Sequence, residues 1–251
     1  MVHTDRGAKL GGVILPRTVE WADVEPGSVL MGSDNRSVLF GGIGPKHEVV
    51  IKYPFQISIS PVPLEEANRM IESSDVEIAS ESEWELAHSR GLLVADEGAA
   101  EALADTAQDY WGKACDGRPH RARGQTPNLL RVWLKGIPAQ RLQFPVQGSS
   151  PSKVRLVKRD FSGWAEEPPR LPSSRNSSRI LKEEVVICLF FGVIPSFAWA
   201  YFNASDGYIR EAWLNLVFGG VFVGTISRLF WRPRQPTWYV GSGMMSTKRV
   251  K

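Results

Sequence analysis

Cysteine and histidine are scarce in this chain. It has two cysteines, Cys115 and Cys188, in 251 residues. Two cysteines exclude a disulfide-rich scaffold and a four-cysteine zinc site, and they are compatible with a reducing compartment. The four histidines are scattered: His3, His47, His88 and His120. No second histidine or cysteine stands at ligand spacing from His47, so the sequence predicts no metal site, and His47 is expected to be a hydrogen-bonded strand residue.

A large excess of one charge is also lacking. Lys and Arg number 30 and Asp and Glu number 27, and a net charge of +3 is too small to predict a nucleic-acid partner. The N-terminal stretch MVHTDRGAKLGGVILP has no apolar region as long as that of a signal peptide. Hydrophobic residues make up 43% and charged residues 23%, which excludes a wholly disordered or fibrous chain.

Two long hydrophobic runs stand in the C-terminal quarter. Residues 185–202 (VVICLFFGVIPSFAWAYF) carry no charge, and residues 212–231 (AWLNLVFGGVFVGTISRLFW) carry only Arg228. As a helix the first run would span roughly 27 Å, close to the hydrocarbon thickness of a bilayer. Pro195 is disfavoured inside a helix in water but tolerated in a membrane. We therefore predict a hairpin of two transmembrane helices, rather than a buried hairpin in a soluble core.

Basic residues predict the orientation of this hairpin. They flank its two outer ends: Arg170, Arg175, Arg179 and Lys182 on one side, and Arg232, Arg234, Lys248, Arg249 and Lys251 on the other. The connecting segment has Arg210 against Asp206 and Glu211. The positive-inside rule then predicts a multi-pass protein of the cell membrane, with both termini and the soluble domain in the cytoplasm. Membrane lipids are the expected partners.

Small residues mark one face of the second run. Gly220 and Gly224 form a G-x-x-x-G motif, which lets two helix backbones approach closely. We favour packing within the hairpin itself. The alternative is dimerisation, or docking on another membrane subunit.

Composition divides the chain into four parts. We predict a folded domain over residues 13–164, a Pro/Ser/Arg-rich linker over 165–184, the hairpin over 185–231 and a basic C-terminal tail over 232–251. The stretch GWAEEPPRLPSSRNSS, from residue 163 to 178, predicts a linker with no packed core.

Local patterns in the folded part predict an α+β domain. Strands are expected at 29–31, 47–52, 55–59, 131–134 and 154–157, and helices at 63–71, from Ser80 or Ser82 onward, and in the alanine-rich stretch 95–109. Ser80 and Glu83 have the spacing of a capping box, with Trp84, Ala87 and His88 on one helix face.

Charge is segregated along this part of the chain. Residues 61–112 hold thirteen acids and two bases, whereas residues 113–182 hold fifteen bases and four acids. The basic half leads into the hairpin and is suited to resting on anionic lipid headgroups. The other interpretation is that the two halves face each other within the fold, and both can hold at once.

Several segments in order carry a family resemblance. They are VEPGSVLMGS at 24–33, PKHEV at 45–49, FQI at 55–57 with PVP at 61–63, SESEWELA at 80–87 with Arg90 and Gly91, and KVRLV at 153–157. Together they resemble the formylglycine-generating enzyme, or sulfatase-modifying factor, domain, and the Glu-x-Glu-Trp-Glu-x-Ala block is the most specific. The resemblance implies an irregular α+β fold of the C-type-lectin-like kind. It implies structural roles for its signature residues: His47, Glu83, Trp84, Ala87, Arg90 and Gly91.

The departures from this family concern its chemistry. The family's oxidase reaction uses a late pair of cysteines that bind copper, and soft thiolates suit copper(I). Here Cys115 is the only cysteine of the soluble domain, and Cys188 lies inside a predicted span. The three-histidine iron site of the related sulfoxide synthases is absent as well. No catalytic residue and no cofactor are therefore expected.

Two function hypotheses remain. The first is a non-catalytic binding or adaptor module at the cytoplasmic membrane face, whose partner is a protein, a membrane complex or a small ligand. Its candidate surfaces are the glycine-rich loop Phe40–Gly44 and a basic run of Arg118, His120, Arg121 and Arg123, although flexible surface loops remain the favoured interpretation of both. The alternative is a divergent oxidoreductase of sulfatase maturation. In it Cys115, with cationic neighbours that favour a thiolate, would act alone or with a partner's thiol, and copper would be the cofactor.

Overall fold

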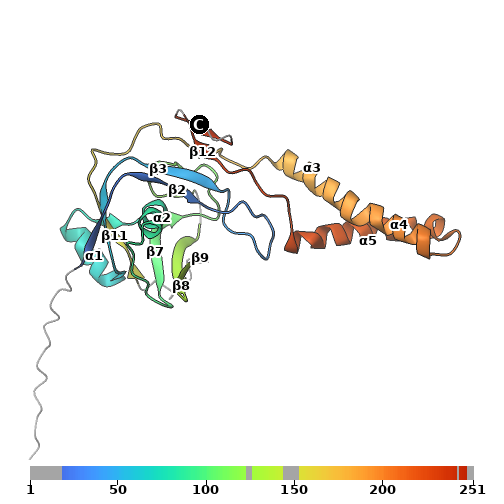
Figure 1. Ribbon diagram of the computed structural model, residues 1–251, viewed down its shortest axis with the longest axis horizontal. Coiled ribbons are helices and arrows are strands. Elements are labelled where there is room, and N and C mark those ends of the chain that lie inside the picture. The colour runs from blue at the N-terminus through green and yellow to red at the C-terminus, as the bar shows by residue number, and fades with distance from the viewer. Residues whose placement is uncertain (1–18, 123–125, 144–152, 242, 248–251) are drawn as a thin grey trace, which may run out of the picture.

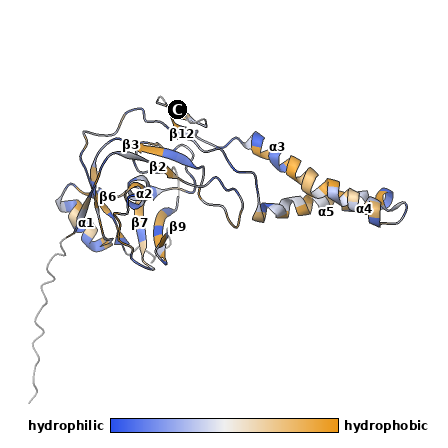
Figure 2. Cartoon of the chain, in the orientation of Figure 1, coloured by the Kyte–Doolittle hydropathy of each residue, from blue (hydrophilic) through white to orange (hydrophobic). Residues whose placement is uncertain are grey.

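The computed structural model describes residues 19–122, 126–143, 153–241 and 243–247. An α+β domain forms one end of the molecule, and a long helical hairpin extends from one side of it (Figure 1). The hairpin is mostly hydrophobic along its length, whereas apolar and polar residues alternate in the domain (Figure 2).

The domain contains most of the strands. They are β1 Trp21–Val24, β2 Gly27–Met31, β3 His47–Ile51, β4 Phe55–Ser58, β5 Val62–Pro63, β6 Glu77–Ile78, β7 Ala100–Thr106, β8 Asn128–Leu134, β9 Ile137–Gln143, β10 Lys153–Val154 and β11 Leu156–Arg159. One sheet has the order β1-β4-β11-β6, a second has the order β5-β10-β7-β8-β9, and β2 pairs with β3. All pairs are antiparallel except β10 with β7.

Two helices belong to the domain, α1 Leu64–Ser73 and α2 Glu81–Ser89. The predicted capping box at the start of α2 is confirmed: the Ser80 hydroxyl accepts from the Glu83 amide at 3.2 Å, and the Glu83 carboxylate accepts from the Ser80 amide at 2.8 Å. Trp84 and Ala87 are fully buried, and the Trp84 and His88 rings lie 5.1 Å apart on the expected common face. The resemblance to the family is not needed for this helix, because local rules produce it.

The expected helix over 95–109 is wrong, because residues 100–106 form β7. β7 lies inside the five-stranded sheet, between β10 and β8. The fully buried Glu101 carboxylate accepts from the indole N–H groups of Trp84 and Trp133, each at 2.9 Å, and from Arg155 Nε at 2.7 Å. These distant partners override the helix preference of alanine.

The other expected elements of the domain are confirmed, with small shifts at their ends. The strands expected at 29–31, 47–52, 55–59 and 131–134 overlap β2, β3, β4 and β8, respectively. The helix expected at 63–71 corresponds to α1. The strand expected at 154–157 is divided between β10 and β11.

The acidic and basic halves of the sequence face each other. Four buried or nearly buried ion pairs join them at N–O distances of 2.6–3.0 Å: Glu81–Arg131, Glu83–Arg159, Glu101–Arg155 and Asp105–Lys113. Part of the segregated charge is therefore paired inside the fold, and the bases nearer the hairpin remain for other contacts.

The segment predicted as a linker without a packed core is in part packed on the domain. Leu171 is 2% exposed and belongs to the main hydrophobic cluster. Its amide donates to the Lys113 carbonyl at 3.0 Å, and the carbonyls of Pro169 and Pro172 accept from the amides of Cys115 and Gly112. Proline lacks an N–H but keeps its carbonyl, so this segment still pairs along one side.

Part of the segment predicted as a basic C-terminal tail also packs on the domain. The Trp238 amide donates to the Lys46 carbonyl, and its own carbonyl accepts from the Glu48 amide, both at 2.9 Å. Two short strands follow, β12 Tyr239–Val240 and β13 Met245–Ser246. The hairpin therefore leaves the domain between two segments that are both bound to it.

The hairpin consists of α3 Ser177–Cys188, the π-helical turn η1 Leu189–Val193, α4 Ile194–Asn203 and α5 Tyr208–Phe230. The first three form one continuous helix, and π-helical turns of this kind relieve the clash that a proline such as Pro195 causes inside a helix. Both arms are long and apolar enough to cross a membrane by length and composition. The helical arms begin at Ser177 and Tyr208, before the apolar runs that start at residues 185 and 212. Charged residues next to an apolar run can extend its helix.

Small residues bring the two arms together. A Cβ atom added to Gly220 would lie 2.5 Å from Val193 Cα, and one added to Gly224 would lie 2.6 Å from Cys188 Cα. Gly220 and Gly224 thus face the first arm, where only a glycine fits.

Candidate functional site: a basic cleft at the base of the hairpin

The loop between β2 and β3 reaches across to the end of α5. It comprises residues 32–46, and its amides at Val38 and Leu39 donate to the carbonyls of Arg228 and Leu229, at 3.1 and 3.0 Å. The last carbonyls of a helix have no partner within the helix, and this loop supplies one for two of them. The contact joins the soluble domain to the hairpin.

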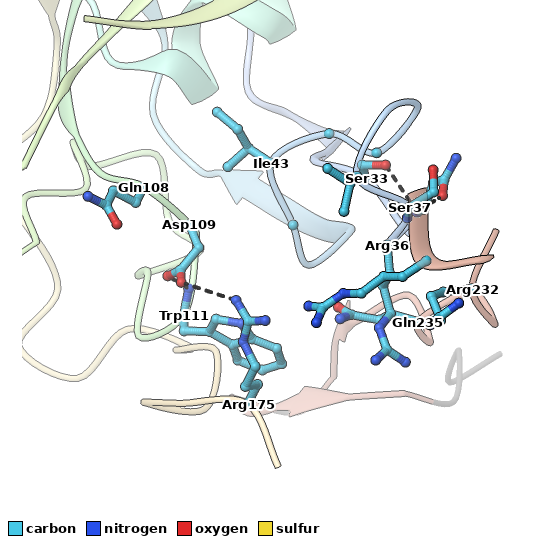
Figure 3. Close-up of a pocket in the computed structure, with 16 residues that line it drawn as sticks. Ser33, Arg36, Ser37, Ile43, Gln108, Asp109, Trp111, Arg175, Arg232 and Gln235 are labelled. Atoms are coloured by element: carbon cyan, nitrogen blue, oxygen red, sulfur yellow. Dashed lines mark hydrogen bonds and ion pairs between the residues drawn. The ribbon is translucent and has the colours of Figure 1, made fainter. Parts of the chain in front are cut away.

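A cleft of about 280 Å³ lies between this loop and the hairpin base. Figure 3 shows its residues, which come from the β2–β3 loop, the 108–111 segment, the end of α5 and the two chain segments beside the hairpin. Its charged lining residues are Arg36, Asp109, Arg175, Arg228 and Arg232. Four arginines against one acid make the wall of the cleft basic.

Two of these arginines are held by glutamates of α3. Arg36 Nη1 lies 2.5 Å from Glu183 Oε2, and its Nη2 lies 3.9 Å from Glu184 Oε1. Arg232, 2% exposed, places its Nη2 2.8 Å from Glu184 Oε2. Arg232 also donates to the carbonyl of Gly224 at 3.2 Å, so it caps the C-terminal end of α5. These pairs fix the loop, α3 and α5 to one another.

The other two arginines keep their donors available. Arg175 approaches Asp109 only to 3.9 Å, the contact drawn as a dashed line in Figure 3. Half of the Arg175 side chain is exposed. Arg228 is exposed, and its side chain makes no hydrogen bond or ion pair with any residue of the described ranges. A guanidinium offers five N–H donors and matches the planar oxygens of phosphate or carboxylate groups. The cleft, which both arginines line, can therefore receive a small anionic group.

An apolar crevice of about 190 Å³ adjoins the basic cleft. Trp111, Pro172, Ile180, Pro236 and Trp238 supply its apolar lining, and the indole rings of Trp111 and Trp238 meet edge to face at 6.5 Å. The cleft and the crevice have four lining residues in common: Arg36, Trp111, Arg175 and Gln235. A ligand in the cleft thus has apolar surface beside it.

The basic run that the sequence singled out does not form a common surface. Arg118 is bound by Asp116, with Nη2 to Oδ2 at 2.7 Å, and its guanidinium lies 5.4 Å from the Trp164 ring centre. Arg121 is exposed on a bridge with Thr106. Arg123 lies outside the described residues.

His120, the remaining member of that run, is half-buried beside Asp105. Its amide donates to Asp105 Oδ1 at 2.9 Å. Burial, with the positive charge of Lys113, lowers the pKa of its imidazole. It therefore serves the buried network around Asp105 rather than a basic surface.

The glycine-rich loop Phe40–Gly44 does reach the candidate site. Gly41, Gly42, Ile43 and Gly44 line the basic cleft, while Phe40 is 67% exposed. Sequence reasoning identified this loop but missed Arg36 beside it. An arginine followed by the apolar run Val38–Phe40 is the signal in the sequence that could have found it.

Of the residues that the family resemblance singled out, His47, Glu83, Trp84 and Ala87 are buried, Arg90 and Gly91 are exposed just after α2, and none of them lines the cleft. The Glu83 carboxylate accepts from the Tyr53 hydroxyl at 2.8 Å and from Arg159 Nε at 2.6 Å. Arg90 Nη1 donates to the Glu25 carbonyl at 2.6 Å, and Gly91 adopts a left-handed φ of 70° just after α2. These contacts are structural.

His47 is buried at the start of β3. Its Nδ1 lies 2.8 Å from the Pro45 carbonyl, and its ring centre lies 4.9 Å from that of Tyr110. Burial, together with the nearby charge of Lys113, lowers its pKa to about 3. The imidazole is therefore neutral. Within the described residues, no group of three or more His, Cys, Asp or Glu side chains could hold a metal ion.

Cys115 is not poised for reaction. Its side chain is 1% exposed, and burial raises the pKa of its thiol to about 12 despite the neighbouring Lys113. A thiolate, the reactive form, is therefore disfavoured there. Cys188 lies in the hairpin at the end of α3, so the two sulfurs belong to different parts of the fold and do not fit a shared copper ion.

Comparisons of the chain with protein-family models, with curated proteins and with solved structures found no match.

Proposed function

We propose that this chain is a membrane-anchored, non-catalytic binding module. The hairpin crosses the membrane, the α+β domain rests on its cytoplasmic face, and the basic cleft binds an anionic group of a protein partner or a small ligand. The observation that carries this proposal is the pair Arg175 and Arg228, whose guanidinium donors are available in a cleft of about 280 Å³ at the hairpin base.

The attachment of the domain supports an adaptor role. Both segments that flank the hairpin pack on the domain, through Leu171 on one side and Trp238 on the other. Such a domain cannot swing on a flexible tether, so its cleft is presented at one fixed height above the bilayer. The basic residues around it suit the anionic cytoplasmic leaflet.

The fold family remains part of the proposal. The ordered motifs around His47, Glu83 and Trp84 support a degenerate sulfatase-modifying-factor domain of the C-type-lectin-like kind. A rigid base that presents variable loops suits binding. A divergent formylglycine-generating oxidoreductase is the weaker proposal, since Cys115 is buried, protonated and separated from Cys188.

Anion titration of the full-length protein in detergent micelles tests the cleft. We expect inorganic pyrophosphate to bind, as followed by calorimetry, and Arg228→Gln to weaken that binding about tenfold by removing a charge-assisted contact. Arg228→Lys keeps the charge but loses the planar fork, so an intermediate affinity is expected. Because the Arg228 side chain has no partner among the described residues, its removal leaves the fold intact.

The matched control is Arg69→Gln, an exposed arginine of α1. It changes the net charge equally and should leave pyrophosphate affinity unchanged. Equal losses in Arg69→Gln and Arg228→Gln would mean that the anion senses only overall charge. Undetectable binding by the wild-type protein would also contradict the proposal.

A further inference from the structure

Three consecutive apolar side chains form the tip of the β2–β3 loop. Val38, Leu39 and Phe40 are 60%, 57% and 67% exposed. Single exposed apolar residues are ordinary on a soluble surface, but a contiguous group marks a contact with another apolar phase. The basic cleft does not use this group, since of the three only Val38 lines it.

The tip has its backbone amides satisfied. Val38 and Leu39 donate to the last turn of α5, as described above. The Phe40 amide donates to Ser37 Oγ at 3.3 Å, and the Gly41 amide donates to the Ser37 carbonyl at 2.9 Å. Four successive amides therefore need no water.

A polar framework below the tip holds it in this shape. Asn35 Nδ2 donates to the Phe40 carbonyl at 3.1 Å, and Asn35 Oδ1 accepts from the Ser37 amide at 3.0 Å. Ser37 itself is 4% exposed. The polar side chains thus turn inward and the apolar ones outward, the reverse of an ordinary solvated loop. An irregular segment can enter a hydrocarbon phase only where its backbone groups are paired, and this loop meets that requirement.

The position of the tip identifies the apolar phase. It is bonded to Arg228 and Leu229, and the next residues of the chain, Phe230 and Trp231, are 57% and 50% exposed. In Figure 1 the loop lies beside the end of α5 nearest the domain. The tip therefore continues the apolar surface of the hairpin at the level where tryptophan and arginine side chains favour the membrane interface.

We infer that Val38–Phe40 is a membrane-inserting wedge that dips into the bilayer beside α5. It makes a third point of membrane contact and holds the wall of the basic cleft against the lipid surface. This inference rests on the proposed function, because it requires that the hairpin crosses a bilayer.

Depth-dependent quenching of a single fluorophore tests the wedge. The full-length protein with Cys115→Ala and Cys188→Ala is reconstituted into phosphatidylcholine–phosphatidylserine vesicles. One cysteine, labelled with an environment-sensitive dye, is introduced at Phe40, at Phe218 in the middle of α5, or at Ile137 on the β8–β9 hairpin. Ile137 is the matched control, since it is apolar and 70% exposed, close to the 67% of Phe40.

We expect the dye at 40 to be quenched by spin-labelled lipids with nitroxides near the headgroup, and protected from a water-soluble quencher at least threefold relative to the dye at 137. Quenching from water at 40 equal to that at 137 would overturn the wedge. Protection from both quenchers would overturn it too, since a protein surface would then cover the tip. If the dye at 218 is not quenched by lipid nitroxides, the hairpin does not cross the bilayer, and the proposed function fails independently of the wedge.

Discussion

At the scale of single residues, buried ionisable groups connect the acidic and basic halves of the chain. Glu101 accepts from two indoles and one guanidinium, and its partners Trp84, Trp133 and Arg155 are themselves buried. Glu81, also fully buried, accepts from the Tyr110 hydroxyl at 2.7 Å. Sequence patterns do not reveal such clusters, because each member is supplied by a different element.

The buried imidazole of His47 gives a pH-dependent stability. Its pKa is about 3 when folded and 6.5 in a model compound, so the unfolded chain binds a proton more readily below pH 6.5. The free energy of unfolding is therefore highest above pH 6.5 and falls below it, by up to about 1.4 kcal/mol per pH unit. His120, whose pKa is lowered too, acts in the same direction.

Thermal unfolding followed by tryptophan fluorescence between pH 7.5 and 5 measures this effect. The wild-type midpoint should fall with pH, and His47→Gln should fall less steeply, since glutamine does not titrate. Parallel profiles for the two proteins would show that folding does not shift the pKa of His47, and would contradict a neutral, buried imidazole.

At the scale of elements, local patterns predicted the elements whose stabilising contacts are local, and failed where distant residues determine the structure. The capping box spans only the four residues from Ser80 to Glu83, and it predicted the start of α2. The strand β7 depends on Glu101 reaching Arg155, and Leu171 is buried although prolines surround it. Neither the Glu101–Arg155 ion pair nor the burial of Leu171 can be predicted from the residues next to it in the sequence. The cleft also depends on a long-range contact, because Arg36 binds Glu183, which is 147 residues away in the sequence.

The two arms of the hairpin provide a matched pair of substitutions. A Cβ at Gly220 would lie 2.5 Å from Val193 Cα, whereas one at Gly219 meets nothing within 4 Å. Gly220→Leu should therefore force the arms apart and lower the midpoint of helix unfolding in detergent by several degrees, as followed by circular dichroism. Gly219→Leu adds the same side chain and should leave the midpoint unchanged or slightly higher.

An equal effect of the two substitutions would change the interpretation of the G-x-x-x-G motif. If Gly219→Leu were as destabilising as Gly220→Leu, the glycines would serve a second protein surface rather than the pairing of the arms.

At the scale of the whole molecule, domain and hairpin form one connected body. Segments on both sides of the hairpin pack on the domain, and Glu184 joins α3 to Arg232 beyond α5. Composition predicted a linker without a packed core and a basic C-terminal tail here, because proline- and serine-rich segments are also typical of disordered chains. What it could not predict is that these residues find specific partners at the hairpin base.

The proposed function depends above all on the hairpin crossing a bilayer with the domain in the cytoplasm. Labelling with a membrane-impermeant maleimide measures this directly, with one cysteine at Asp206 in the α4–α5 turn and another at Glu72 on α1, in separate proteins. The wild-type chain gives the background from Cys115 and Cys188. In right-side-out vesicles we expect labelling at 206 and none at 72, with the reverse in inverted vesicles. Labelling of both positions from the same side would contradict it.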